Sequence, residues 1–445
     1  EAIPPLWLCL SSRPGSKLRS DAESVVVEIK QDRLAVGGFT ASHSFKTNTK
    51  ENYHNRHSII AQATTATAPF FDMPVPLGTS GNFPRLGFLE NMEMVRLAGN
   101  GDFDDTHQFM SRQPAWQPGA QLPWNETDDI SKHKIAVYFT TRAYGGHVYI
   151  QAPLAAVKVV ESEDETAKGA PNTGKLGIHT IQGVFTNPGH VDRPFIYQVS
   201  KLAAGRSFQT CLITARQPKQ PSSNPSGPFP ESDSKLPLGP ICFSCHVTFK
   251  QPVPSFADLQ LSSAQERFAS ILAQRKPDEW PTSPQLDIDI LNDTFPNAGH
   301  GGFPIVDMYK VDMKPYNANK PIPERRELLL YKLHKPIPVE DTNSHILVHA
   351  FEADRNGLLT ISNYLGWGYN LGVAASLSYT FTVHVNSEEA VMRDGWWIQE
   401  VCWPRISAGR ATLESRIWSP EGKHVASGYQ DGIAGPDQKR GAEKL

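Results

Sequence analysis

Long hydrophobic runs are missing from this sequence, and none approaches the roughly 18 consecutive apolar residues of a membrane-spanning helix. Cysteine is scarce: 445 residues contain 5, an odd number that does not indicate a disulfide framework. Charge of one sign is not in excess, since the formal net charge is −3 at pH 7. These absences exclude a membrane protein built from apolar helices, a disulfide-stapled secreted domain and an electrostatic nucleic-acid binder.

Several motifs of catalytic and cofactor-binding proteins are also missing. The sequence has no G-x-S-x-G, no Walker A motif and no G-x-G-x-x-G after a predicted strand. Cys242, Cys245 and His246 match the haem c attachment pattern, but residues 241–250 are typical of a strand, where this spacing puts the two thiols on opposite faces. No second Cys or His pair stands at zinc-ligand spacing. The sequence therefore predicts no cofactor and no metal.

What is present is concentrated between Ser344 and Gly432. Residues 344–366 carry apolar side chains at spacings near three and four, which predicts one long helix. Segments rich in β-branched and aromatic residues follow, with turn residues between them, and predict successive antiparallel strands. This order indicates an α+β fold in which a curved sheet wraps a helix.

The two halves of the sequence repeat the same order of elements. The first half has a predicted helix at 143–160 and then a strand at 179–185, which matches the strand at 375–381 of the second half. An Ala-Gly-Arg turn follows in each half, beginning at Ala204 and at Ala408. The repetition predicts a duplicated domain.

Three polar residues stand in the second half where a core is expected. Asp354 interrupts the predicted helix, Ser376 begins the next strand, and Gln430 ends the last strand before Asp431 and Gly432. This order resembles the acyl-CoA thioesterase II family, a double-hotdog fold with an Asp in the central helix, a Thr or Ser at the head of the next strand, and a Gln before an acidic residue and Gly. In the first half the resemblance is carried by residues 144–156, 179–185, 197–208 and 245–250.

The resemblance implies hydrolysis of an acyl-CoA thioester by an activated water, without an acyl-enzyme. Asp354 would be the general base. Gln430 would orient the water by donating one hydrogen bond and accepting another, and Ser376 would be the third anchor. Taken singly, the three residues also fit plainer roles: a solvated helix carboxylate, a hydroxyl at a strand start and a polar residue at a sheet edge.

The sequence departs from the family pattern close to this signature. The family has Asp-His two and three residues after the Thr or Ser, whereas this chain has Ser378 and Tyr379, and Glu352 stands near Asp354 where small residues are usual. Two alternatives therefore stay open. One is an enzyme of the same fold that acts on a carrier-bound or polyketide-like acyl group, including non-hydrolytic chemistry. The other is a catalytically inactive hotdog protein that binds acyl ligands.

The predicted layout is a tail at 1–20, a first hotdog repeat at 21–256, a connecting segment at 257–300, a second repeat at 301–436 and a tail at 437–445. We expect a hairpin at Ser24–Thr40 and two insertions in the first repeat. Residues 46–133 are polar and turn-rich, which predicts few regular elements and a cover for the pocket mouth. Residues 216–240 hold seven prolines and predict an exposed, flexible loop that packs no core.

The sequence predicts an intracellular protein, cytoplasmic or peroxisomal, that takes part in fatty acid or lipid metabolism. The last three residues, Glu443-Lys444-Leu445, loosely resemble the peroxisomal Ser-Lys-Leu address, but Glu443 does not fit its first position. The expected partner is the acyl-CoA substrate, with neither nucleic acid nor a membrane. Homo-oligomers formed through the hotdog sheets are a further expectation.

Overall fold

The computed structural model describes residues 84–98, 106–124, 142–166, 175–205 and 207–437, all within one compact unit, residues 73–445. The hairpin expected at Ser24–Thr40, the tail at 1–20 and the tail after residue 437 lie outside these residues, so these three expectations stay predictions.

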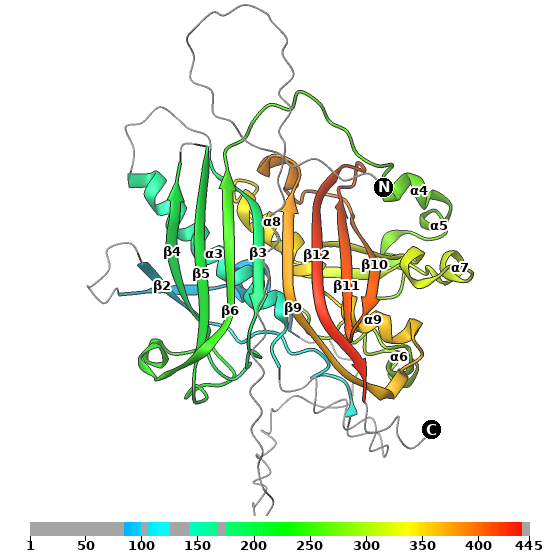
Figure 1. The fold of residues 1–445 in the computed structure, drawn as a ribbon, viewed down its shortest axis with the longest axis horizontal. Helices are drawn as coiled ribbons and strands as arrows, with labels where there is room; N and C mark the ends of the chain where they lie inside the picture. The colour runs from blue at the N-terminus through cyan, green and yellow to red at the C-terminus, as the bar shows by residue number, and fades with distance from the viewer. Residues whose placement is uncertain (1–83, 99–105, 125–141, 167–174, 206, 438–445) are drawn as a thin grey trace, which may run out of the picture. The chain divides into compact units, whose positions relative to one another are not determined.

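One antiparallel sheet dominates the described part of the chain. Its strands are β1 Met94–Leu97, β2 Thr106–Ser111, β3 Gly177–Phe185, β4 Ile196–Ala204, β5 Phe208–Pro218, β6 Leu238–Lys250, β7 Val306–Lys310, β8 Glu327–Leu333, β9 Leu371–Val383, β10 Trp397–Ser407, β11 Arg410–Trp418 and β12 His424–Pro436. They lie in the order β1-β2-β4-β5-β6-β3-β9-β12-β11-β10-β8-β7 (Figure 1). Reading outward from the central pair β3–β9, each half passes through matching strands in the same sequence order. This symmetry confirms the predicted α+β double-hotdog fold.

Short helices connect the strands, and one longer helical segment belongs to each half. The α-helices are α1 Phe88–Asn91, α3 Gly145–Thr166, α4 Ala264–Arg267, α5 Ala269–Leu272, α6 Asp289–Thr294, α7 Lys314–Asn317, α8 Thr342–Ala353 and α9 Gly357–Tyr364. Figure 1 shows α3 and α8 behind the same sheet, and the two helices pack against each other. Among the described residues, no helix is both long and apolar enough to span a membrane.

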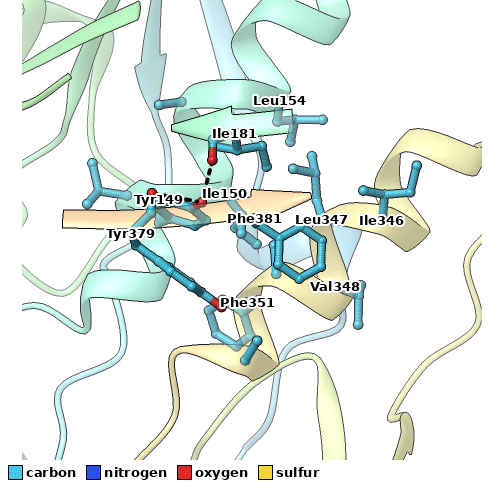
Figure 2. Packing of buried hydrophobic residues seen from close by; sticks show 14 of the residues in the cluster. Tyr149, Ile150, Leu154, Ile181, Ile346, Leu347, Val348, Phe351, Tyr379 and Phe381 are labelled. Atoms are coloured by element: carbon cyan, nitrogen blue, oxygen red, sulfur yellow. Dashed lines mark hydrogen bonds between the residues drawn. The ribbon is translucent and has the colours of Figure 1, made fainter. Parts of the chain in front are cut away.

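The core is continuous across the junction of the two halves. Tyr149 of α3 stacks on Tyr379 of β9 with ring centroids 4.5 Å apart, and its hydroxyl lies 3.1 Å from the Ile181 carbonyl of β3 (Figure 2). Leu347 and Phe351 of α8 are buried in the same cluster. Large aromatic rings buried at this junction stabilise it through apolar area and through ring geometry. The two halves therefore share one hydrophobic core.

The single long helix predicted over residues 344–366 is wrong, because the structure divides it. The first part, α8, ends at Ala353, and α9 starts at Gly357. Asn356 between them has a φ of 59°, the left-handed region that Asn tolerates better than most residues. Its side-chain amide donates to the Pro284 carbonyl over 2.8 Å, which holds the break. The break makes Asp354 the C-cap of α8.

The interpretation of residues 46–133 as an insertion with few regular elements is wrong for its described part. Residues 94–97 and 106–111 form β1 and β2, the counterparts of β7 and β8, and β2 pairs with β4 at the sheet edge. Sequence reasoning missed them because short edge strands carry little alternation of apolar and polar residues. Their pairing is long-range, and it is not encoded in local turn residues.

Residues 219–237, within the predicted insertion at 216–240, connect β5 to β6 at the place of the short β11–β12 turn. Most of these residues are exposed, as predicted, but the prediction that the loop packs no core is wrong. Phe229 is 1% exposed, its amide donates to the Arg112 carbonyl over 2.7 Å, and Asp233 is 3% exposed. Burial of one aromatic ring is enough to hold this proline-rich segment against the domain. The prolines reduce the conformational entropy that the segment loses when it becomes ordered.

Replacing Phe229 by Ala tests this packing. We expect the free energy of unfolding to fall by roughly 3 kcal/mol, the low end for removing a buried Phe side chain. The measurement is the urea midpoint at constant m-value. Ser223→Ala, at an exposed position of the same loop, is the matched control. Equal midpoints for the two variants would show that the loop is not docked.

Candidate active site

A cavity of about 300 Å³ lies where the two halves meet beside the end of α8. Asp354, Ser376 and Gln430 all line it, together with Gly145, the first residue of α3. Its apolar lining includes Phe185, Phe195, Leu358, Leu359 and Leu377. The structure thus brings the three predicted site residues, which are up to 76 positions apart in the chain, to one cavity.

Asp354 is held by the end of one helix and the beginning of another. As the C-cap of α8 it is 9% exposed, and a backbone hydrogen bond from Gly146 of α3 reaches its carboxylate. A Cβ on Gly145 would stand 3.1 Å from its Oδ2, which is tight, so glycine allows the close approach of α3. The positive end of the α3 dipole therefore faces this carboxylate.

A β-bulge places Ser376 on the same face of the sheet as Gln430. In the β9–β12 pair, Tyr379 lies opposite Gln430, but the register shifts so that Gly432 lies opposite Ser376. Leu377 is the extra residue. Without it, Ser376 would point to the opposite face from Gln430, since side chains alternate along a strand. Sequence reasoning found Ser376 by resemblance, and it had no signal for the bulge.

One amide group joins the three side chains. The Gln430 nitrogen donates to an Asp354 carboxylate oxygen and, over 2.7 Å, to Ser376 Oγ. A carboxylate accepts but cannot donate, so the amide nitrogen faces Asp354. Both N–H groups are then used and the Ser376 hydroxyl donates to Asp354, which leaves the Gln430 oxygen for a water or a substrate. Gln430 itself is 3% exposed, so the geometry is fixed by burial as well.

Burial decides the protonation of Asp354. Removal from water raises its pKa from an ordinary value of 3.8 to about 7, although the hydrogen bonds from Gln430, Gly146 and Ser376 act in the opposite direction. A carboxyl with a pKa near neutrality exists in both forms at physiological pH. Such a group can accept a proton and return it.

The first half of the chain has the same bulge but not the same side chains. In the β3–β6 pair the register shifts between Ile178 and Thr180, as it does between Ser376 and Ser378 in β9–β12. Ile178 therefore corresponds to Ser376. By the same register Val247, opposite Ile181, corresponds to Gln430. Ile178 and Val247 are buried apolar residues. The two matched positions therefore carry polar side chains only in the second half.

The residues that depart from the family pattern lie outside the cavity lining. Tyr379, at the second position of the family's Asp-His, is 1% exposed and belongs to the aromatic core beside Tyr149. Glu352 is fully buried, and burial raises its pKa well above the ordinary range. The altered residues therefore contribute to packing at the junction.

Sequence reasoning missed several polar residues of the cavity lining, among them Trp116, Gln285 and Arg355. Arg355 follows Asp354 directly, but nothing in the sequence pattern separates a buried arginine from an exposed one. Trp116 and Gln285 come from the segments expected to be an insertion and a connection.

Two family models match the chain: the acyl-CoA thioesterase N-terminal domain over residues 137–225 and the acyl-CoA thioesterase C-terminal domain over residues 320–434. Among solved structures, the acyl-CoA thioesterase II TesB2 of Mycobacterium marinum is 17% identical and covers 79% of this chain and 100% of its own, with a TM-score of 0.49. The TesB protein of Mycobacterium avium subspecies paratuberculosis is 16% identical and covers 78% and 98%, with a TM-score of 0.46. No protein of curated function matches the sequence.

The described sheet and its two matching halves define a double-hotdog protein. The N-terminal and C-terminal family models fall on these two halves in order. Over these two ranges the chain is similar to acyl-CoA thioesterases.

Asp354→Asn should change the pH dependence of stability. The folded pKa of about 7 lies above the unfolded value near 3.8, so the folded state binds the proton more tightly. The free energy of unfolding therefore falls as pH rises between these values, by an amount on the order of 4 kcal/mol at most. The variant lacks this loss, and we expect it to be more stable than the wild type at pH 8 and similar at pH 4.

Denaturant titrations at the two pH values measure this difference. Asp394→Asn, at an exposed position, is the matched control and should behave like the wild type at both. We compare the free energy of unfolding of the wild type with that of Asp354→Asn. If the wild-type value does not fall relative to the variant between pH 4 and pH 8, the raised pKa of Asp354 is contradicted.

Proposed function

We propose that the chain hydrolyses acyl-CoA thioesters to the free acid and CoA, with Asp354 as general base. The observation that supports this most strongly is the hydrogen-bonded group of Asp354, Gln430 and Ser376 on the wall of one cavity. Similarity to the two acyl-CoA thioesterase domains supports the thioester class of substrate.

A water beside Asp354 gives up a proton to the carboxylate as its oxygen attacks the acyl carbon. The Gln430 amide oxygen accepts the second hydrogen of this water, and the Ser376 hydroxyl, which donates to Asp354, helps to hold the carboxylate in place. The role of Gln430 thus differs from the sequence-based prediction, since both of its N–H groups hold neighbouring side chains. The C–S bond of the tetrahedral intermediate then breaks, and the proton on Asp354 returns to the leaving thiolate.

The developing oxyanion needs hydrogen-bond donors or a positive dipole. We assign this role to the N-terminus of α3, because its first residue, Gly145, lines the cavity beside Asp354. The apolar part of the lining, with Phe185, Leu358 and Leu359, would take the acyl chain. Trp116 and Pro118 of the segment expected to cover the pocket mouth also line the cavity, which supports a part of that hypothesis.

The alternatives predict different outcomes of simple assays. A carrier-specific enzyme would hydrolyse an acyl-carrier thioester faster than the matching acyl-CoA. An inactive binder would retain an acyl ligand in native mass spectrometry and would release no thiol. The intracellular location and homo-oligomers through the sheets stay predictions from the sequence.

Asp354→Asn keeps the shape of the side chain and removes the proton acceptor. We expect the rate of thiol release from acyl-CoA to fall by roughly 10²–10⁴-fold, the usual contribution of general-base catalysis. Gln430→Ala should also lower the rate. Combining it with Asp354→Asn should cost little more, because residues that act as a unit are not additive. Additive losses, or an Asp354→Asn rate above half of the wild-type rate, would refute the assignment.

The pH–rate profile should report the Asp354 carboxyl. Only the ionised form accepts a proton, so kcat/KM should rise with pH and level off with a midpoint near 7. The hydrogen bond from Gln430 lowers the pKa of Asp354, and Gln430→Ala should therefore move the midpoint to higher pH. Asp394→Asn should leave the midpoint unchanged. A midpoint below pH 5 in the wild type would exclude Asp354 as the titrating base.

A further inference from the structure

Three residues that line the cavity carry buried N–H donors with no hydrogen-bond partner among the described residues. We call Trp116, Gln285 and Arg355 the donor corner, since all three line the cavity. The Trp116 indole N–H, the Gln285 amide, and Nε and Nη1 of Arg355 are buried without a hydrogen bond to any described group. Buried donors of this kind are rare in folded proteins and cost free energy unless a ligand or water satisfies them.

Arg355 is the strongest member of the donor corner. It is 1% exposed, and its guanidinium lies over the Phe303 ring at 3.8 Å and over the Trp116 ring at 5.2 Å. Its Nη2 donates to the Pro284 carbonyl over 2.8 Å. These contacts fix the position of the guanidinium. A fixed side chain loses little entropy when it binds a ligand.

No described carboxylate forms an ion pair with Arg355. Glu352 is near in sequence, but neither of its carboxyl oxygens has a hydrogen-bond partner among the described groups, and burial raises its pKa well above the ordinary range. Asp354 is committed to Gln430 and to Gly146. Burial lowers the pKa of Arg355 to about 9, so the guanidinium still carries its charge at neutral pH. The donor corner therefore holds a charge and N–H donors that no described group satisfies by a hydrogen bond.

We propose that the donor corner binds a carboxylate carried by the acyl group, so that the preferred substrate is the CoA thioester of a short dicarboxylic acid. This inference rests on the proposed function, since it places the thioester beside Asp354 in the same cavity. A cavity of about 300 Å³ is at the small end of ligand sites. It suits a short acyl chain with a polar terminus. The phosphates of CoA are part of the larger CoA moiety of the substrate and not of its acyl chain.

Binding measurements on an inactive protein test the inference directly. The Asp354→Asn variant should bind CoA thioesters without turnover, so dissociation constants can be measured by calorimetry. The ligands are three pairs of equal carbon number: succinyl and butyryl, glutaryl and pentanoyl, and adipoyl and hexanoyl CoA. At the length that fits, we expect the carboxylate form to bind roughly 10- to 100-fold more tightly, as for a hydrogen bond to a charged group.

Further variants on this background identify the donors. Arg355→Met should abolish the preference for the carboxylate, Gln285→Leu should reduce it, and Arg216→Met, at an exposed site outside the cavity lining, should leave it unchanged. If Arg355→Met does not fold, as judged by circular dichroism, Gln285→Leu and Trp116→Phe decide the question in the same way.

The outcomes separate this inference from the proposed function. Equal dissociation constants within each pair at all three lengths, or a preference that survives removal of the donors, would overturn the donor corner as a carboxylate site. Failure of the wild type to release thiol from any of the six thioesters would overturn hydrolysis instead. In that case the paired dissociation constants would still support or overturn the subsite.

Discussion

The antiparallel pairing of β3 with β9 is the constraint on which the other features depend. It joins two half-sheets of the same design into one and brings α3 of the first half against α8 of the second. Without that pairing, the N-terminus of α3 would not reach Asp354, because the two lie in different repeats. The aromatic stack of Tyr149 on Tyr379 stabilises the junction. The site is thus a property of the duplicated fold rather than of either half.

At this junction two opposing effects decide the state of one carboxyl group. Burial disfavours the charge on Asp354, and donors from Gln430, Gly146 and Ser376 favour it. Desolvation outweighs the donors, which leaves a carboxyl that titrates near neutrality and costs the folded state stability at high pH. Proteins often accept such a cost at functional sites. The matched positions of the first half, Ile178 and Val247, carry buried apolar side chains at the same bulge.

Much of the second half could be predicted because its signals are local. The strands follow from β-branched and aromatic runs, and the turn at Ala408 follows from Gly409, whose φ is 72°. Asp354, Ser376 and Gln430 could be placed together by resemblance, although their roles stay a prediction.

The features that were missed depend on contacts distant in sequence. The helix break at Asn356 depends on the Pro284 carbonyl, 72 residues away. The strands β1 and β2 depend on pairing with β4. The docking of Phe229 depends on Arg112, and the burial of Arg355 depends on Phe303. No periodicity in one sequence carries this information, because each feature is decided by a partner in another element.

In the proposed mechanism, Asp354 is a buried carboxyl that exchanges a proton at neutral pH. A carbon-13 NMR titration of aspartate carboxyl groups tests it most directly, with the Asp354 signal assigned by its absence in Asp354→Asn. We expect the Asp354 carboxyl to titrate with a midpoint near pH 7. A midpoint near pH 4, the value of an exposed aspartate, would contradict it.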